Sequence, residues 1–280
     1  MKKIVLTLIF IIIFSQVVTQ TVNSCPGCGL GELGYWLNGR WIVLSTDRTA
    51  PSAIVVSSTN VYIVGRSVFN AFYWHNGKFV ELPRTGEFAY ASAMFIYDSN
   101  TYIVGYDGSF MNHGDAVYWL NGSRTVLPKT VMTASASAIA VSGSNVYIVG
   151  QQGDWRNSDA VYWINGALTV LPKTAASANA NAIAVSGSDV YIAGRDGDDA
   201  VYWLNGRRIM LPRNGRSASA NAIAISGSDV YIAGGDGDDA VYWLNGRQVF
   251  LPKTTNYARA RAITVSGSDV YIIGAHYFDQ

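Results

Sequence analysis

The chain of 280 residues has little of what most catalytic and metal sites are built from. It contains 3 histidines and 2 cysteines, and 14% of its residues are charged. His75, His113 and His276 lie far apart, and no Gly-x-Ser-x-Gly elbow, metal-spaced histidine pair or glycine-rich phosphate loop accompanies them. The sequence therefore predicts no catalytic residues, no metal and no cofactor.

An excess of positive charge is also missing. The chain has 20 Lys and Arg against 19 Asp and Glu, and two of the lysines, Lys2 and Lys3, precede the first apolar segment. A protein that binds nucleic acid needs a concentrated basic surface. We therefore expect no nucleic-acid partner.

Long apolar runs are confined to the start of the chain. Met1-Lys2-Lys3 precedes an apolar segment from Ile4 to Val18, which has the charged start and short core of an export signal. A membrane-spanning helix needs about 20 apolar residues. We predict that residues 1–20 are a signal peptide, with an uncleaved anchor as the alternative. The rest then has no transmembrane span and is secreted, periplasmic or on the cell surface.

Both cysteines lie in a linker, residues 21–33, as Cys25-Pro26-Gly27-Cys28. In an oxidising compartment this pair predicts a local disulfide. The preceding Val22-Asn23-Ser24 also resembles a bacterial lipoprotein processing site, so a lipid anchor at Cys25 is an alternative. Half of a zinc knuckle is a third interpretation, although no second pair is present.

What the sequence does contain is a repeat. Tyr-Trp-x-Asn-Gly begins at Tyr35, Tyr73, Tyr118, Tyr162, Tyr202 and Tyr242. A second phrase, Val-Tyr-Ile or Thr-Tyr-Ile, begins at Val61, Thr101, Val146, Val190, Val230 and Val270. Periods of about 40 to 50 residues indicate propellers or helical arrays, and no helical period follows the leader.

Each repeat predicts four short strands, A to D, with an Asn-Gly hairpin turn between C and D. The chain starts with a C and D pair, Gly34–Gly39 and Trp41–Leu44, and ends with an A and B pair, Ala262–Val265 and Val270–Ile273. These halves complete one another if the chain closes into a ring, which removes exposed sheet edges. The predicted fold is all-β: residues 34–280 form a six-bladed β-propeller of four-stranded antiparallel blades. Its ring is closed where the N-terminal C and D strands join the C-terminal A and B strands, and we expect a monomer.

The repeat also resembles a known family. Leu-Pro, a polar loop and then Ala-Ile-Ala-Ile-Ser-Gly-Ser-Asp-Val-Tyr-Ile-Ala-Gly-Gly, best seen up to Gly235, is similar to a kelch-type propeller repeat over residues 34–274. The resemblance implies a propeller. It also implies an enzymatic alternative, a sugar isomerase or lyase.

One face of the predicted ring carries the variable segments. The A–B and C–D turns recur almost unchanged, whereas the B–C loops differ and contain His113, Trp155 and Arg156. Variation confined to one face indicates a binding face. The loops at Asp196–Asp199 and Asp236–Asp239 offer calcium ligands as a further alternative, although Asp-Gly is ordinary turn chemistry.

The A strands supply a second group of candidates, because positions two apart point the same way on a strand. One set is Ser52, Ser92, Ser137, Asn181, Asn221 and Arg261, and the other is Ala50, Tyr90, Ser135, Asn179, Ser219 and Arg259. We expect them to line the mouth of a central channel and to suit a sugar or a carboxylate. An empty, water-filled channel is the alternative. The predicted ligand-binding residues are Tyr90, His113, Trp155, Arg156, Asn179, Asn181, Asn221, Arg259 and Arg261.

The sequence favours an exported binding protein over an enzyme. Its ligand is expected to be a carbohydrate or a protein, held by the variable loops and the channel mouth. One alternative is a carbohydrate-active enzyme, an isomerase or lyase that uses Arg259, Arg261, Tyr90 and His113. The other is a structural surface protein.

Overall fold

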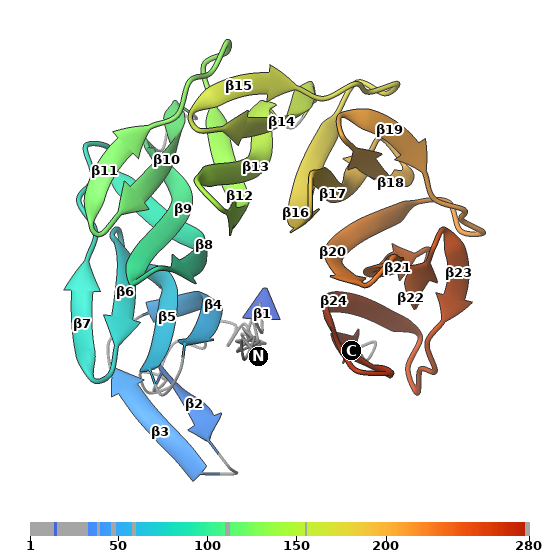
Figure 1. Ribbon diagram of the computed structural model, residues 1–280, viewed down its shortest axis with the longest axis horizontal. Helices are drawn as coiled ribbons and strands as arrows, with labels where there is room; N and C mark the ends of the chain where they lie inside the picture. The colour runs from blue at the N-terminus through green and yellow to red at the C-terminus, as the bar shows by residue number, and fades with distance from the viewer. Residues whose placement is uncertain are drawn as a thin grey trace, which may run out of the picture.

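The strands predicted from the repeats are present in a computed structural model of the chain (Figure 1). The structure describes residues 14–15, 33–37, 40–45, 49–57, 60–109, 113–154 and 156–277. All regular elements in these segments are β-strands, so the fold is all-β. The same segments contain no helix that is long and apolar enough to cross a membrane.

Five blades of four antiparallel strands follow one another along the chain, and within each blade the strands pair in sequence order. The first two blades consist of β4 (Thr49–Ser57), β5 (Asn60–Ser67), β6 (Ala71–His75), β7 (Lys78–Glu81) and of β8 (Phe88–Tyr97), β9 (Asn100–Gly108), β10 (Gly114–Leu120), β11 (Ser123–Val126). The third and fourth consist of β12 (Ala134–Ser142), β13 (Asn145–Gly153), β14 (Ser158–Ile164), β15 (Ala167–Val170) and of β16 (Ala178–Ser186), β17 (Asp189–Asp196), β18 (Asp199–Leu204), β19 (Arg207–Met210). The fifth consists of β20 (Ala218–Ser226), β21 (Asp229–Asp236), β22 (Asp239–Leu244) and β23 (Arg247–Phe250).

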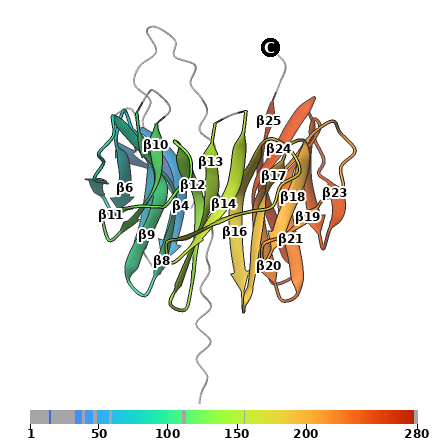
Figure 2. The same cartoon turned by 90° about the horizontal axis from the view of Figure 1, so that it is seen from above.

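The blades stand side by side around a common axis, with the A strands β4, β8, β12, β16 and β20 innermost and the short D strands outermost (Figure 1). Seen from the side, the strands run through the thickness of a disc (Figure 2). Each inner strand contacts the inner strand of the next blade. This arrangement is a β-propeller.

In the described segments, the strands predicted to close the ring are not paired with one another. β24 (Tyr257–Ser266) and β25 (Asp269–Tyr277) pair only with each other, and β2 (Leu33–Leu37) and β3 (Arg40–Ser45) form a separate hairpin. Figure 1 shows the ring open between β24 and β4, with the β2–β3 hairpin on the first-blade side of the opening. β1 (Phe14–Ser15), which falls within the predicted signal peptide, pairs with β4 at Ala53 and Ile54.

Buried tryptophans join each blade to the one before it. The C strands contribute Trp119, Trp163, Trp203 and Trp243, whose side chains have no exposed surface. Each indole N–H donates to the carbonyl of the proline that ends the preceding blade: Trp119 to Pro83 at 2.9 Å, Trp163 to Pro128 at 2.8 Å, Trp203 to Pro172 at 2.9 Å and Trp243 to Pro212 at 2.9 Å. Burial on both faces of a blade explains why the C strands are continuously apolar in sequence.

The A strands depart from the predicted alternation at one point. A β-bulge interrupts the A–B pairing of the five complete blades and of β24–β25, and in the third blade it falls at Ser137, between Ala136 and Ala138. Opposite this bulge the backbone comes so close that a Cβ built on Gly150 would lie 2.0 Å from the carbonyl oxygen of Ser135. A glycine is therefore required there. The alternation of buried and half-buried residues therefore shifts after the bulge residue.

The invariant face of the disc is held by its turns. In the third blade Asn165 and Gly166 have φ of 51° and 84°, as a two-residue hairpin turn requires. The Asn165 side chain accepts from the backbone N–H of Val146 at 2.9 Å and donates to Asn145 at 2.9 Å, which joins the C–D turn to the A–B turn. The prediction that these turns share a face is confirmed, and their side chains are used for structure.

Candidate functional site

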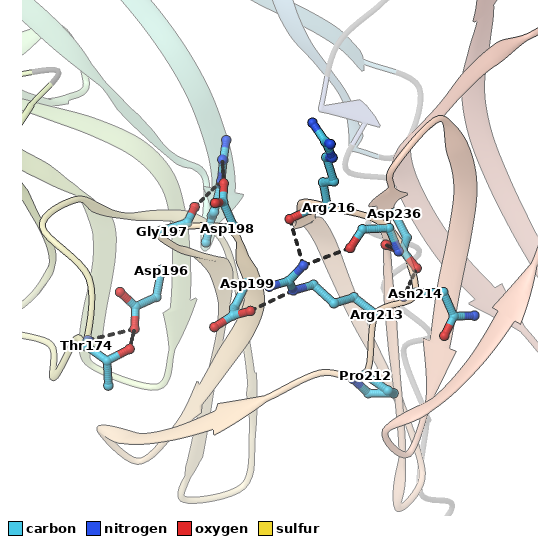
Figure 3. A network of polar contacts seen from close by, with 12 residues as sticks. Thr174, Asp196, Gly197, Asp198, Asp199, Pro212, Arg213, Asn214, Arg216 and Asp236 are labelled. Atoms are coloured by element: carbon cyan, nitrogen blue, oxygen red, sulfur yellow. Dashed lines mark hydrogen bonds and ion pairs between the residues drawn. The ribbon is translucent and has the colours of Figure 1, made fainter.

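The loops of the opposite face are fixed by three buried carboxylates, Asp107, Asp196 and Asp236, here called the anchor carboxylates. Each lies near the end of a B strand and faces the loop that enters its own blade. Asp196 accepts hydrogen bonds from the backbone and hydroxyl of Thr174, both at 2.8 Å, and from the backbone N–H of Ala175 at 2.9 Å (Figure 3). The loop conformation is therefore set by the blade that follows it.

Each anchor carboxylate also accepts a hydrogen bond from a side chain on the outer strand of the same blade. The pairs are Arg124 with Asp107 at 2.7 Å, Arg208 with Asp196 at 2.6 Å and Gln248 with Asp236 at 2.8 Å. In the third blade the anchor position holds the neutral Gln152, and Leu168 stands opposite Trp163 where Arg208 stands opposite Trp203. Where the B strand carries an anchor carboxylate, the D strand thus carries a hydrogen-bond donor. Where the B strand carries the neutral Gln152, the D strand carries the apolar Leu168.

The same loops are also held by a basic residue that directly follows the proline at the end of a blade. Lys129 pairs with Asp115 at 2.7 Å, Lys173 with Asp159 at 2.8 Å, Arg213 with Asp199 at 2.8 Å and Lys253 with Asp239 at 2.6 Å. Arg213 also donates to the carbonyls of Gly215 and Arg216 at 2.8 and 2.7 Å, so it bridges a strand and a loop (Figure 3). Of the aspartates considered as calcium ligands, Asp196, Asp199, Asp236 and Asp239 therefore have structural partners in this arrangement.

These contacts set the acid behaviour of the fold. Burial alone would raise the pKa of Asp196, but hydrogen bonds from Ala175 and Thr174 and the charge of Arg208 outweigh it, so the pKa lies below its usual value. Asp236 shows the same balance: burial opposes hydrogen bonds from Asn214, Gln248 and Gly215, and its pKa is again lowered. A carboxyl whose pKa is lower folded than unfolded stabilises the fold above its unfolded pKa of about 4.

We therefore expect the free energy of unfolding to change little from pH 7 to about pH 5 and to fall as the pH drops through the lowered folded-state pKa values. Urea unfolding followed by circular dichroism between pH 7 and pH 2 measures this. The variant Asp196→Asn, which cannot ionise, should show a shallower acid dependence than the wild type. An unchanged slope would show that this carboxylate does not titrate with folding.

Near the variable face, cross-strand pairs bring residues of the A and B strands together. The pairs are Ala50 with Arg66, Tyr90 with Tyr106, Ser135 with Gln151, Asn179 with Arg195, Ser219 with Gly235 and Arg259 with Ala275. These twelve positions are called the inner ring. The sequence identified its A-strand half only.

The second blade supplies an aromatic cluster to the inner ring. Tyr90 stacks on Tyr106 with ring centres 5.3 Å apart, and Phe88 lies 5.4 Å from Tyr106. Tyr106 is buried because it covers Gly108 and Gly114, where any Cβ would collide with its ring. Burial and Tyr106 raise the pKa of Tyr90 although a Ser135 hydrogen bond and Arg66 oppose this, so Tyr90 remains a neutral phenol at neutral pH.

Arg259 enters the inner ring from β24. Its guanidinium carbon lies 4.2 Å from the centre of the Tyr257 ring, and it donates to the carbonyl of Ala258 at 3.2 Å. A Cβ built on Gly235 would lie 2.5 Å from Cδ of Arg259, so the side chain of Arg259 occupies the space that other blades fill with a B-strand side chain. The cation–π contact with Tyr257 and the space left by Gly235 together position the Arg259 guanidinium.

The remaining A-strand candidates have different surroundings. Asn181 and Asn221 donate across to the next blade, to the carbonyls of Ala220 at 2.9 Å and Ala260 at 2.8 Å. Their amide nitrogens therefore join blades. Asn179 accepts from the hydroxyl of Ser158 at 3.1 Å, and Arg261, which falls at the bulge of β24, is half-buried.

The loop candidates lie at the rim. His113 is exposed, and its carbonyl accepts from the backbone N–H of Ser109 at 2.8 Å. Arg156 is exposed in a turn held by Asp154, which accepts its backbone N–H at 2.8 Å. Neither is part of the inner ring. Trp155, Cys25 and Cys28 lie outside the described residues, so their roles remain predictions.

The sequence missed the B-strand half of the inner ring, which includes Arg66, Tyr106 and Arg195. A usable signal was present, since the position after the fixed glycine of each B strand is the most variable in an otherwise repetitive strand. Also missed were exposed apolar side chains on the variable face: Val68 and Phe69, exposed by 55% and 48%, and Met132, exposed by 66%. They belong to loops of the first three blades.

Comparison with known proteins supports the fold and leaves the chemistry open. No family model matches the chain, and no curated protein matches it. The computationally designed Ika8 protein is 17% identical, with a TM-score of 0.53 over 89% of this chain and 76% of that chain. The Aleuria aurantia lectin AAL, solved with Fucα1-6GlcNAc, is 11% identical over 76% of this chain and 83% of that chain, with a TM-score of 0.47. A thermostable family-43 glycoside hydrolase is 9% identical over 81% of this chain and 93% of that chain, with a TM-score of 0.46.

Proposed function

We propose that this protein is a carbohydrate-binding β-propeller whose site is the inner ring. The observation that carries the proposal is the combination of the Tyr90–Tyr106 stack with the positioned cation of Arg259, in a ring whose other polar side chains are serine, asparagine, glutamine and two further arginines. Aromatic rings offer apolar area, and serine, asparagine and glutamine offer uncharged hydrogen-bonding groups. Few, fixed polar groups around an apolar surface are typical of small-ligand sites.

The arginines narrow the ligand further. Arg66, Arg195 and Arg259 all belong to the inner ring, and no inner-ring position holds a carboxylate. Arg195 already pairs with Asp198 at 2.9 Å, so the proposal rests on Arg66 and Arg259. A guanidinium binds a carboxylate through two parallel hydrogen bonds, whereas a neutral sugar offers it only hydroxyls. The proposal therefore favours a sugar that bears a carboxylate.

The proposed cellular location and repeat family rest on features of the sequence. The leader and the Cys25–Cys28 linker favour an exported or surface-attached protein, and the repeat favours a kelch-like propeller of six blades. The exposed loops of the first three blades favour a second candidate, a protein ligand. Val68, Phe69 and Met132 present apolar surface that a partner would bury.

Thermal unfolding of the protein with a panel of acidic sugars, neutral sugars and small carboxylates tests the proposal. A ligand at 100 times its dissociation constant should stabilise the wild type by about 2.7 kcal/mol. The variant Arg259→Ala with Arg261→Ala should lose the shift given by acidic sugars. Arg216→Ala, which removes an exposed arginine of a neighbouring loop, is the matched control and should keep it.

Three outcomes would change the conclusion. A shift that both variants retain would place the ligand elsewhere. No shift with any compound would contradict a small-ligand site and favour the protein ligand. Turnover of a bound sugar that is lost in the double variant would show an enzyme.

A further inference from the structure

The polar groups of the inner ring differ in whether the fold already uses them. In the fourth blade the Arg195 guanidinium pairs with Asp198 at 2.9 Å. In β24 the Arg259 guanidinium lies over Tyr257 and donates to the carbonyl of Ala258 at 3.2 Å. Both of these cations are therefore engaged within the protein before any ligand binds.

Arg66 is the inner-ring arginine that differs from these two. It is exposed near the end of β5, and among the described residues its side chain takes part in no hydrogen bond or ion pair. In the same segments the half-buried Gln151 of the third blade also has an amide without a hydrogen-bond partner. A guanidinium offers several donors in a planar fork, and an amide offers donors and an acceptor. The first and third blades thus hold two groups that a ligand can bind without breaking a contact of the fold.

Tyr90 belongs to the blade between these two groups. Its strand, β8, contacts β5 of the first blade and β12 of the third. The charge of Arg66 is close enough to influence the Tyr90 phenol, and a hydrogen bond joins the side chains of Tyr90 and Ser135. Ser135 is in turn the residue opposite Gln151. Side chains of three consecutive blades therefore gather around Tyr90.

Tyr90 also provides the accessible aromatic surface of this cluster. Tyr106 is only 6% exposed and supports Tyr90 in the stack at 5.3 Å, whereas Tyr90 itself is half-buried. A tyrosine supported in this way offers apolar area to the C–H groups of a sugar ring. Because the support fixes the ring in advance, little ordering of this side chain is needed when a ligand binds.

We infer that Arg66, Tyr90 and Gln151 form the main subsite of the inner ring, and that it takes a sugar bearing a carboxylate. This inference rests on the proposed function and adds which blades bind the ligand. The sugar ring packs on Tyr90, its carboxylate receives two parallel hydrogen bonds from Arg66, and Gln151 binds a hydroxyl. Arg259 adds positive charge to the same ring. Arg66 is then the residue that distinguishes an acidic sugar from a neutral one.

Isothermal titration of the full chain with glucuronate and with its methyl ester tests this assignment, since the ester keeps the sugar ring and removes the charge. The wild type should bind glucuronate more tightly than the ester. Arg66→Ala should weaken glucuronate binding by about 10- to 100-fold, the loss expected for a pair of charge-assisted hydrogen bonds, and should leave ester binding nearly unchanged. Arg66→Lys keeps the charge without the planar fork and should fall between the two.

Two further variants separate the parts of the subsite. Tyr90→Leu keeps apolar bulk over Tyr106 but removes the flat ring, so it should weaken glucuronate and ester alike, by about 2- to 10-fold. The matched control is Arg195→Gln with Asp198→Asn, which neutralises an inner-ring arginine together with its partner and leaves the net charge unchanged. It should bind both compounds as the wild type does. Circular dichroism of each variant shows whether the fold is retained.

The possible results distinguish this inference from the proposed function. Equal glucuronate binding by the wild type and Arg66→Ala would overturn the subsite and leave a carbohydrate-binding inner ring in place. A loss in the Arg195 and Asp198 control alone would place the carboxylate in the fourth blade and also overturn it. Equal weakening of acid and ester by Arg66→Ala would show that Arg66 does not recognise the charge. If the wild type binds neither these compounds nor any other sugar, both the proposed function and the subsite are wrong.

Discussion

Replacing Asp196 by alanine should lower the free energy of unfolding by about 3 to 5 kcal/mol, the range expected when a buried ion pair loses one partner. The side chain of Asp196 has no exposed surface, and it receives the Arg208 guanidinium and two backbone N–H groups of the preceding loop. The substitution leaves these donors without an acceptor in a region that water reaches poorly. Chemical unfolding followed by tryptophan fluorescence measures the change.

Asp198→Ala is the matched control two residues away. Asp198 pairs with Arg195 at 2.9 Å, but its side chain is 67% exposed, and such surface pairs contribute less than about 1 kcal/mol. A small effect of both substitutions would mean that the loop finds other acceptors. A large effect of both would point to the backbone of this segment and not to the carboxylate.

Replacing Trp203 by alanine should also lower the free energy of unfolding by about 3 to 5 kcal/mol. The indole is completely buried, and its removal leaves a cavity between blades. Trp203 also donates to the Pro172 carbonyl at 2.9 Å, and that carbonyl would lose its partner. A comparable loss is not expected at Tyr202, whose side chain is only partly buried in the same strand.

Trp203→Phe separates the two contributions. It keeps an aromatic ring in the space and removes the N–H donor, so the free energy of unfolding should fall by less than in the alanine variant. Thermal and urea unfolding of both variants give the comparison. Equal losses would indicate that the hydrogen bond to Pro172 dominates, and no loss in either would contradict the assignment of this residue to the contact between blades.

The blade pattern could be predicted because its signals are local. An Asn-Gly pair between apolar segments predicts a hairpin on its own, and the turns at Asn165 and Asn245 follow this rule. The bulge at Ser137 was not predicted, although Gly150, which allows the close approach of the backbone opposite it, is visible in the sequence. Closure of the ring was predicted by counting the strands of each repeat. Such a count does not show whether the strands at the two ends of the chain are paired.

The candidate site was predicted in part for a related reason. Tyr90 and Arg259 were found because they stand out in aligned A strands, but Asn181 and Asn221 stand out equally and are used to join blades. A polar residue beside alanines indicates a special role without saying which. The role of Asp196 was hidden because its partners, Thr174 and Arg208, lie on either side of it in sequence and become neighbours only in the folded blade.

The anchor carboxylates make the two ends of the array of blades different. Each is carried by one blade and holds the loop that leaves the blade before it, as Asp236 holds Asn214 and Gly215. Loss of the last blade would free a loop that water can solvate, whereas loss of the first would leave Asp107 buried beside Arg124 without the amides of Thr85 and Gly86. The array is therefore more tolerant of shortening and of added copies at its C-terminal end than at its N-terminal end.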